Sequence, residues 1–333
     1  MTIRVAVIGA GVMGADHARI IATQIPGATL QAVCDADEAR AKTIASEFGA
    51  KRVATDPLAV IGSADVDAVL LASPDATHAP LAIACIGAGK PVLCEKPMAP
   101  TTAECLRVID AEVKAGRRLV QVGFMRRFDP SYADMKRVLA SGAIGEALMF
   151  HCVHRNVSAP PWFTSDMAIT NSLPHEFDIA RWVLDTEFKS ISVFQPKTAG
   201  PAKLVTPVFV VVETQGGQLV DIEMNNNAGY GYDVRGELVG VTGTVALRSP
   251  ARSETNLSLL RGERYPEDWR PWFAEAYRLQ NQAWIASLAT GRPVGSSAWD
   301  GYAATAIAEA GVKARGSGRP EPVQLIVKPE LYA

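Results

Sequence analysis

Short hydrophobic runs alternate with helix-periodic stretches over the first third of the chain. Residues 3–8 form a β-branched run with two largely apolar faces, which is typical of a buried parallel strand. Similar runs follow at 29–34, 67–72, 91–94 and 119–124, with helical patterns between them at 15–23, 38–48, 79–88 and 101–115. This alternation predicts βαβ units and an α/β domain of the Rossmann type, with a doubly wound parallel sheet.

The pattern changes after about residue 125. Helical segments are expected at 130–140 and at about 172–184, with a strand at 147–153 between them. Strand patterns joined by short turns then follow at 190–194, 208–214, 218–224, 234–239 and 244–247, and helical patterns return at 273–290 and 298–314. Consecutive strands with short turns predict a large, mainly antiparallel sheet. We therefore expect an α/β domain at 1–124 and an α+β domain at 125–333.

A glycine-rich turn joins the first strand to the first helix. Gly9-Ala10-Gly11-Val12-Met13-Gly14 has the G-x-G-x-x-G spacing. In such turns the first glycine permits a tight bend, the second lets the backbone approach a pyrophosphate, and the third lets helix and strand pack closely. N–H groups and the dipole at the helix start favour phosphate there. A glycine turn without a ligand is the alternative, but the order of strand, turn, helix, strand and acid favours a dinucleotide site.

Asp35 supplies the acid, directly after the second strand. It lies about 20 residues beyond the last glycine, where it is placed to accept hydrogen bonds from the adenosine ribose hydroxyls. Its carboxylate would repel a 2′-phosphate, and Ala36-Asp37-Glu38 supplies no arginine to receive one. We therefore expect the cofactor to be NAD rather than NADP.

Residues that follow the other strands are the next candidates, because ligands on doubly wound sheets bind beyond the carboxyl ends of the strands. This rule singles out Ser73-Pro74, Glu95-Lys96-Pro97 and Arg126. The segment around Lys96 is either a surface loop or a loop whose ammonium group holds a substrate hydroxyl and stabilises a developing alkoxide. The Lys96–Pro97 bond is a candidate for the cis isomer.

Two stripes run along the helix expected at 172–184. Leu173, Phe177, Ala180 and Leu184 form an apolar face, and His175, Asp178 and Trp182 lie on a different face. Pro174 belongs in a first turn, so the helix should begin near residue 171 or 172. A histidine near a helix start is usually a hydrogen-bonded surface or core residue, so the spacing alone leaves both that interpretation and a catalytic role for His175 open.

Composition excludes several classes of protein. The chain has 333 residues, 48% hydrophobic and 20% charged, with a net charge of −2, which argues against nucleic-acid or anionic-membrane partners. Its five cysteines form no C-x-x-C motif, which fits reduced thiols in a cytoplasm. We expect no signal peptide and no membrane-spanning segment. Only Cys152 and His154 share a strand face, so no metal site is expected.

Together these motifs resemble the Gfo/Idh/MocA family of NAD(P)-dependent oxidoreductases over nearly the whole chain. The shared motifs are Gly9–Gly14, Ser73-Pro74 with His78, and Glu95-Lys96-Pro97. Within the family, segments 122–129, 154–156, 175–178 and 230–233 are most similar to inositol 2-dehydrogenases. The resemblance implies that residues 1–124 bind the dinucleotide and that residues 125–333 bind substrate and mediate oligomerisation.

The resemblance also implies roles for single residues. The cofactor would be bound by Gly9, Gly11, Val12, Met13, Gly14, Asp35, Ser73, Pro74, His78, Glu95 and Lys96. Lys96 and His175 become the catalytic candidates. The cyclitol contacts would be Arg126, His154, Asn156, Asp178 and Tyr232.

One departure from the family concerns Asn171. Inositol dehydrogenases resembling this chain carry an aspartate four residues before the histidine, and this chain has an asparagine there. An amide cannot stabilise an imidazolium as a carboxylate does. Asn171 therefore either weakens catalysis, adapts the site to another substrate, or serves only as a helix N-cap.

The expected reaction is NAD-dependent oxidation of a ring secondary alcohol, with myo-inositol as the expected substrate. The alternatives are a sugar or sugar-acid dehydrogenase of the same family, a glycoside hydrolase that uses bound NAD, and a cofactor-binding protein without turnover. The resemblance further implies a homotetramer in which the sheets of the second domain pack together. The apolar alternation at 207–212 and 219–224 predicts an apolar outer face on that sheet.

Overall fold

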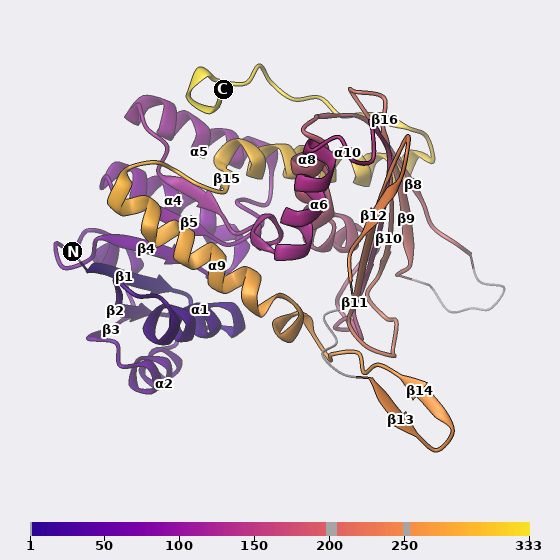
Figure 1. Ribbon diagram of the computed structural model, residues 1–333. Coiled ribbons are helices and arrows are strands. Elements are labelled where there is room, and N and C mark those ends of the chain that lie inside the picture. Colours follow the sequence, from indigo (N-terminus) through magenta and orange to yellow (C-terminus); the bar gives the residue numbers. More distant parts are fainter. Residues whose placement is uncertain (1, 198–204, 249–253) are drawn as a thin grey trace. The chain divides into compact units, whose positions relative to one another are not determined.

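A computed structural model describes residues 2–197, 205–248 and 254–333 (Figure 1). The chain divides into two compact units. Unit 1 comprises Met1–Phe128, Glu275–Thr305 and Leu325–Ala333, and unit 2 comprises Asp129–Ala274 and Ala306–Gln324. The boundary predicted after residue 124 lies close to the end of the first segment of unit 1. No sequence pattern predicted that the two later segments, 275–305 and 325–333, belong to unit 1.

Unit 1 contains a seven-stranded sheet in the order β15-β6-β5-β4-β1-β2-β3. The strands are β1 (Ile3–Ile8), β2 (Ala28–Cys34), β3 (Arg52–Ala54), β4 (Ala68–Leu71), β5 (Val92–Cys94), β6 (Val120–Val122) and β15 (Ser296–Ser297). All neighbours are parallel except β15, which runs antiparallel to β6. The order from β3 to β6 is that of a Rossmann domain, and the strand order reverses between β1 and β4. The predicted fold is confirmed.

Helices connect these parallel strands. They are α1 (Val12–Gln24), α2 (Glu38–Phe48), α3 (Pro57–Ile61), η1 (Asp75–Thr77), α4 (His78–Gly87), α5 (Thr102–Ala115) and η2 (Met125–Phe128). Thr101 caps α5, since its hydroxyl accepts the Glu104 N–H at 3.3 Å and donates to the Glu104 carboxylate at 2.8 Å. α1 begins at Val12 rather than at the expected residue 15, because the end of the glycine turn is already helical.

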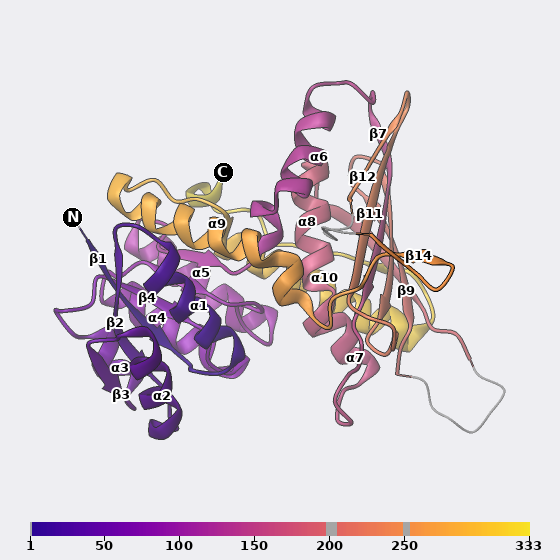
Figure 2. The ribbon, with the colours of Figure 1, turned by 60° about the horizontal axis from the view of Figure 1, so that its bottom comes forward.

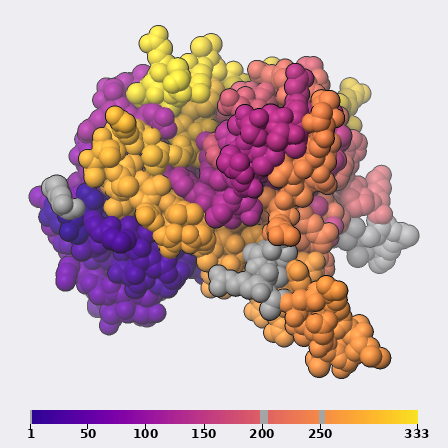
Figure 3. Space-filling model, viewed as in Figure 1, coloured from indigo at the N-terminus to yellow at the C-terminus, as the bar shows by residue number. Residues whose placement is uncertain are grey.

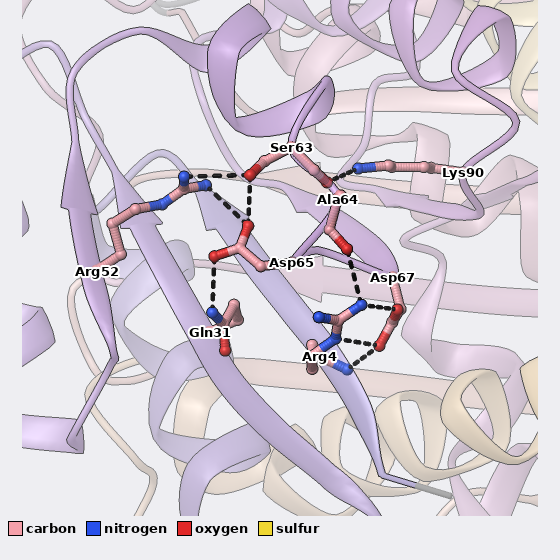
Figure 4. Close-up of polar contacts among 8 residues, drawn as sticks. All are labelled: Arg4, Gln31, Arg52, Ser63, Ala64, Asp65, Asp67 and Lys90. Atoms are coloured by element: carbon pink, nitrogen blue, oxygen red, sulfur yellow. Dashed lines mark hydrogen bonds and ion pairs between the residues drawn. The ribbon is translucent and has the colours of Figure 1, made fainter.

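The amino ends of the strands in this sheet are joined by a polar network (Figure 4). Arg4 in β1 donates to both carboxylate oxygens of Asp67, at 3.0 and 2.7 Å, and to the Ala64 carbonyl at 2.9 Å. These hydrogen bonds lower the pKa of Asp67. Gln31 donates to Asp65 at 2.9 Å. This edge is thus tied together by side chains, whereas the opposite edge carries the candidate ligand-binding residues.

Unit 2 contains a second seven-stranded sheet, in the order β12-β11-β7-β10-β9-β8-β16. The strands are β7 (Ala147–Arg155), β8 (Phe188–Phe194), β9 (Val208–Thr214), β10 (Leu219–Asn225), β11 (Asp233–Gly240), β12 (Thr244–Ala246) and β16 (Glu321–Pro322). β7 and β10 pair in parallel, and the other neighbours are antiparallel. The expectation of a mainly antiparallel sheet is confirmed.

Helices cover one face of this sheet (Figure 2). They include α6 (Pro130–Ala140), α7 (Ser165–Met167), a π-helical turn η3 (Ala168–Ser172) and α8 (Pro174–Leu184). Phe177 of α8 packs edge-on against Phe188 of β8, with 6.3 Å between ring centroids. The boundaries between the units fall within α9 (Trp269–Thr290) and α10 (Ala298–Ser317). The chain ends in the short helix η4 (Glu330–Tyr332).

The other face of the unit 2 sheet is mixed rather than apolar, so that prediction is wrong. Polar pairs join neighbouring strands: the ion pairs of Arg155 with Glu223 at 2.6 Å and of Lys189 with Glu213 at 2.7 Å, and the hydrogen bond between His151 and Asp221 at 2.5 Å. Side chains alternate along a strand, so the hydrophobic positions of β10 that are fully buried, Val220 and Ile222, leave its acidic positions on the opposite face.

A hairpin outside this sheet was not expected from the sequence. β13 (Thr255–Leu257) pairs with β14 (Leu260–Gly262), and the hairpin projects from the surface of unit 2 (Figure 3). Three leucines at its tip are exposed: Leu257, Leu259 and Leu260. The segment is too short and too polar around these leucines to have been recognised as paired strands.

Candidate active site

The glycine turn has the backbone geometry that phosphate binding requires. Gly9 has φ +95°, and a Cβ on it would lie 2.4 Å from the Ala72 carbonyl oxygen. A Cβ on Gly14 would lie 1.7 Å from the Gly9 oxygen, so the helix packs against the turn only without a side chain. A Cβ on Gly11 would meet nothing within 4 Å. Gly11 therefore faces open space, as expected for a glycine that a ligand approaches closely.

The N-terminus of α1 is directed at that open space. Gly11 is the N-cap residue, and no described side chain caps the helix. The N–H groups of Val12, Met13 and Gly14 belong to the first turn, where a helix has no internal partners for them. An uncapped helix start with a glycine beside it fits the pyrophosphate of a dinucleotide.

Asp35 is held at the end of β2 by backbone donors. Its carboxylate accepts the Ala10 N–H at 2.7 Å and the Asp37 N–H at 2.9 Å. This fixes the carboxylate beside the glycine turn, where a ribose would follow the pyrophosphate. Arg40, which belongs to none of the sequence motifs, has its guanidinium Nη1 3.7 Å from Asp35 Oδ2. The arginine side chain is half exposed and also pairs with Asp37 at 3.2 Å.

His78 joins two of the strand-end loops. The buried imidazole lies with Nε2 2.8 Å from the Ser73 carbonyl oxygen and Nδ1 2.7 Å from the Pro97 carbonyl oxygen. The Ser73 hydroxyl lies 2.6 Å from that of Thr77, the last residue of η1, for which Pro74 is the N-cap residue. The loop after β4 and the loop after β5 are therefore held together around one ring.

Lys96 lies in the second of these loops. It is half-buried, and the Lys96–Pro97 peptide bond is cis, as the sequence indicated. The preceding residue, Glu95, is buried, with Oε1 2.9 Å from His17 Nε2 and Oε2 3.2 Å from the Lys96 backbone nitrogen. Arg126 lies in η2, after β6, and is also buried. Unit 1 thus brings the candidate residues of the glycine turn, Asp35 and the strand-end loops to one edge of its sheet.

In unit 2, β7 and α8 are linked by a buried carboxylate–imidazole pair. His154 Nδ1 lies 3.0 Å from Glu176 Oε1, and the side chains are 6% and 1% exposed. Tyr232 packs edge-on against His154, with 5.8 Å between ring centroids. The Tyr232 ring also contacts Trp272 and Phe273, at 6.0 and 6.4 Å. His154 is therefore held by the Glu176 carboxylate and by the Tyr232 ring, which is itself packed against two aromatic side chains.

Asn156 belongs to a network of amides at the end of β7. Its side-chain NH₂ donates to the side-chain oxygen Oδ1 of Asn226, and the Asn226 side-chain NH₂ in turn donates to the Ser172 hydroxyl at 3.2 Å. The Asn226 backbone N–H is accepted by the Thr206 hydroxyl at 3.2 Å. This network ties the segment before α8 to the ends of β7 and β10.

Asn171 lies in the π-helical turn η3, directly before α8. The N-cap residue of α8 is Leu173, and it makes no capping hydrogen bond, so the N-cap interpretation of Asn171 is wrong. π-Helical turns inside or beside α-helices occur frequently at functional sites. His175 and Asp178 lie in α8 with exposed fractions of 8% and 0%. α8 is buried on both of its stripes, because its polar stripe also faces the interior.

Two residues important to this arrangement were missed. Glu176 stands between His175 and Asp178, and the helical spacing gave it no role because its partner His154 is distant in sequence. Asn226 is part of the Asn225-Asn226-Asn227 segment, which has the composition of an ordinary turn. Only the spatial pairing of β7, β10 and α8 reveals what these two side chains contact.

In the described ranges, no group of three or more histidine, cysteine or acidic side chains is arranged to hold a metal ion. The described helices include none with the length and apolar character needed to cross a bilayer.

Fold and glycine turn together define the chain as a dinucleotide-binding protein of the Rossmann class. Comparison with protein families identifies the family within this class. Residues 3–124 match the model of the Gfo/Idh/MocA oxidoreductase family with an NAD-binding Rossmann fold, and residues 132–246 match the Gfo/Idh/MocA C-terminal domain. The chain belongs to this family of NAD-dependent oxidoreductases, as the resemblance implied.

Similar proteins carry more specific names. A protein named inositol 2-dehydrogenase 1 from Saccharopolyspora erythraea is 51% identical over 335 residues, covering 100% of this chain and 99% of its own. An inositol 2-dehydrogenase from Klebsiella pneumoniae is 44% identical over 100% of this chain and 99% of its own. The crystal structure of myo-inositol dehydrogenase from Lactobacillus casei with NAD(H) and myo-inositol superimposes with a TM-score of 0.95, at 29% identity and full coverage of both chains.

Proposed function

We propose that this protein is an NAD-dependent inositol 2-dehydrogenase, which oxidises a ring hydroxyl of a cyclitol to a ketone. The observation that carries the proposal is the 51% identity, over the whole length of both chains, to a protein named inositol 2-dehydrogenase 1. The structural likeness to a myo-inositol dehydrogenase bound to NAD(H) and myo-inositol supports it. The domain roles follow: residues 1–124 bind cofactor, and residues 125–333 bind substrate.

The proposed cofactor site consists of the glycine turn, Asp35 and the loops after β4 and β5. The pyrophosphate would be held by the glycine turn and the start of α1, namely Gly9, Gly11, Val12, Met13 and Gly14. The Asp35 carboxylate would accept hydrogen bonds from the ribose hydroxyls. Ser73, Pro74, His78, Glu95 and Lys96 line the remainder. Asp35 favours NAD over NADP. Its ion pair with Arg40 reduces this preference, because an arginine beside the ribose is the group that accommodates a 2′-phosphate.

NAD held by these residues would supply the acceptor for the hydride that leaves the carbon being oxidised. His175 is the proposed general base and takes the proton of the reacting hydroxyl. The Lys96 ammonium donates a hydrogen bond to the same oxygen and stabilises negative charge on it as the proton leaves. His175 thus removes the proton, and Lys96 stabilises the negative charge that remains on the oxygen.

Five further residues are proposed to recognise the cyclitol: Arg126, His154, Asn156, Asp178 and Tyr232. A polyol is neutral and presents both donors and acceptors, so a site with a guanidinium, an imidazole, an amide, a carboxylate and a phenol matches it. The pairing of His154 with Glu176 fixes the orientation of that imidazole. A site that distinguishes ring hydroxyls by their position requires side chains with a fixed orientation.

Asn171 favours a second candidate function. An amide four residues before His175 leaves the imidazole without the carboxylate that stabilises its protonated form in the dehydrogenases that the chain resembles. A dehydrogenase of the same family acting on a sugar or sugar acid is therefore the runner-up. A glycoside hydrolase with transient oxidation and a cofactor-binding protein without turnover are the remaining alternatives.

A substrate panel separates these functions. Inositol isomers and aldoses are each incubated with NAD, and net NADH formation is followed at 340 nm. We expect the highest kcat/KM with myo-inositol or a close cyclitol. Activity with aldoses alone would replace the proposal by the sugar dehydrogenase, and release of sugar without net NADH would indicate the hydrolase.

The proposed assembly is a homotetramer in the cytoplasm. The outer face of the unit 2 sheet combines charged pairs with partly exposed Phe209 and Phe194, a mixture suited to contact between subunits. All five cysteines are buried, and none forms a disulfide bond, which suits a reducing compartment. Light scattering at micromolar concentration should give the tetramer mass, and a monomer would contradict the assembly.

A further inference from the structure

Two fully buried polar side chains in unit 1, His17 and Asn281, have no part in the function proposed above. His17 lies in α1 and Asn281 lies in α9, and both are 0% exposed. Burying a polar group costs free energy unless it is hydrogen-bonded, so such groups are retained where their contacts matter. Their contacts lead to Glu95, the neighbour of Lys96.

The three side chains form one chain of hydrogen bonds. Asn281 Nδ2 lies 3.0 Å from His17 Nδ1, and His17 Nε2 lies 2.9 Å from Glu95 Oε1. An amide NH₂ group only donates, so Nδ1 of the imidazole accepts and Nε2 carries the proton that His17 donates to Glu95. Tyr277, also in α9, packs edge-on against the imidazole with 5.7 Å between ring centroids. α9 therefore sets both the tautomer and the plane of the His17 ring.

Glu95 transfers this restraint to the backbone of Lys96. Its second oxygen, Oε2, accepts the Lys96 N–H at 3.2 Å. On the opposite side lies Gly123, directly after β6, where a Cβ would come within 2.9 Å of Glu95 Cδ. The carboxylate is thus hydrogen-bonded to His17 and to the Lys96 backbone, and it occupies space that a side chain at position 123 would need.

We propose that Asn281, His17 and Glu95 form a positioning relay that fixes Lys96 relative to the glycine turn from which α1 begins. The proposal rests on the proposed function, since it takes Lys96 to hold the reacting oxygen. His17 and Asn281 act only through Glu95. Because α1 also begins at the phosphate-binding turn, one rigid helix relates the cofactor site to the lysine. A small misplacement of such a group lowers the rate of chemistry more than it weakens cofactor binding.

Two substitutions of His17 test the relay as a matched pair. In His17→Gln the amide nitrogen reaches the position of Nε2 and still donates to Glu95. In His17→Asn the shorter amide lies near the position of Nδ1 and cannot reach Glu95. We expect His17→Gln to keep kcat within about 3-fold of wild type and His17→Asn to lose about 10-fold or more, with the Kd of NAD changed by less than about 3-fold in both.

A second readout separates positioning from mere loss of stability. With myo-inositol deuterated at the oxidised carbon, the isotope effect on kcat should rise in His17→Asn, because hydride transfer becomes slower relative to product release. Equal kcat and equal isotope effects in the two variants would overturn the relay whatever their Tm. If His17→Asn does not fold, Asn281→Leu removes the same support from α9, and an unchanged kcat there overturns the relay. A wild-type protein that oxidises neither cyclitols nor aldoses overturns the proposed function and the relay together.

Discussion

The two units hold their candidate residues in different ways. At the edge of the unit 1 sheet, the groups that would face a dinucleotide depend largely on the backbone: the first turn of α1, the open side of Gly11, and Asp35 held by the Ala10 and Asp37 N–H groups. In unit 2, side chains hold other side chains, through His154 with Glu176 and Asn156 with Asn226. A site made of backbone is specified by glycine spacing and strand order, whereas a site made of side chains depends on each member of a network.

Removing Lys96 should have the largest effect, because it is the one side chain of unit 1 proposed to touch the reacting oxygen. Lys96→Ala should lower kcat for cyclitol oxidation by about 10²–10³-fold, the usual loss when one donor to a developing oxyanion is removed. The Kd of NAD should change little. Lys90→Ala is the matched control, since Lys90 precedes the same strand β5 at its other end and donates to the Ser63 carbonyl. Steady-state kinetics with NADH absorbance measures both variants, and an unchanged kcat in Lys96→Ala returns Lys96 to an ordinary surface loop.

Restoring a carboxylate in unit 2 should have the next largest effect. Asn171→Asp should raise kcat by at least about 10-fold, because a carboxylate stabilises the protonated imidazole of His175 and general-base assistance is worth about 10²–10⁴-fold. NAD affinity should change little. The control is Asn227→Asp, an exposed position whose side-chain oxygen accepts the Ala159 N–H at 3.0 Å. An aspartate variant that is no faster on any cyclitol would mean that Asn171 is adapted to another substrate or chemistry.

The features of the site that were predicted from the sequence are those that depend on the local backbone. Gly9, Gly11 and Gly14 have the three geometries that their spacing implied, because each role is a property of the local backbone. Arg40 was missed beside Asp35 because a helix turn, rather than the sequence order, brings it back toward β2. Glu176 and Asn226 were missed because their partners lie on other elements, and pairings between distant elements leave no local pattern. The charged outer face was misjudged because the hydrophobic alternation was given more weight than the acidic residues at alternate positions of β10.

Neutralising Glu176 tests whether the unit 2 site depends on its charge network. Glu176→Gln keeps the shape of the side chain but removes the charge that faces His154 at 3.0 Å. We expect KM for the cyclitol to rise by about 10-fold, the effect typical of losing a group that orients a ligand-binding histidine, with a smaller change in kcat. Glu213→Gln, which loses only an exposed pair with Lys189, should leave both constants unchanged. Equal KM and kcat values in the two variants would contradict the claim that the unit 2 site depends on its side-chain network.

The smallest expected effect concerns a buried carboxyl of unit 1 that is remote from the proposed chemistry. Glu112 accepts the Tyr332 hydroxyl at 2.6 Å and the Val120 N–H at 2.7 Å, and burial nevertheless raises its pKa. A carboxyl with a raised folded-state pKa binds its proton more tightly in the folded protein, so its contribution to stability is present at low pH and lost as pH rises through the folded-state pKa.

Glu112→Gln should therefore stabilise the protein at pH 8 and have less effect at pH 4. The expected result is a higher Tm than wild type at pH 8 and a smaller difference at pH 4, because only the charged form of Glu112 is disfavoured by burial. Thermal unfolding of both proteins at the two pH values measures it, with kcat as a check that the site is untouched. A variant destabilised equally at both pH values would mean that the hydrogen bonds from Tyr332 and Val120 outweigh the cost of the buried charge.

The most direct test of the proposed function follows the hydrogen itself. Myo-inositol carrying deuterium at carbon 2 is incubated with the protein and NAD. The reduced cofactor is then isolated, and its deuterium content is measured by mass spectrometry. The proposed function requires one deuterium in each NADH formed, together with an equal amount of keto-inositol. NADH without deuterium would place the oxidation at another carbon, and the absence of any NADH from myo-inositol, under conditions where NAD binds, would contradict the assignment as an inositol 2-dehydrogenase.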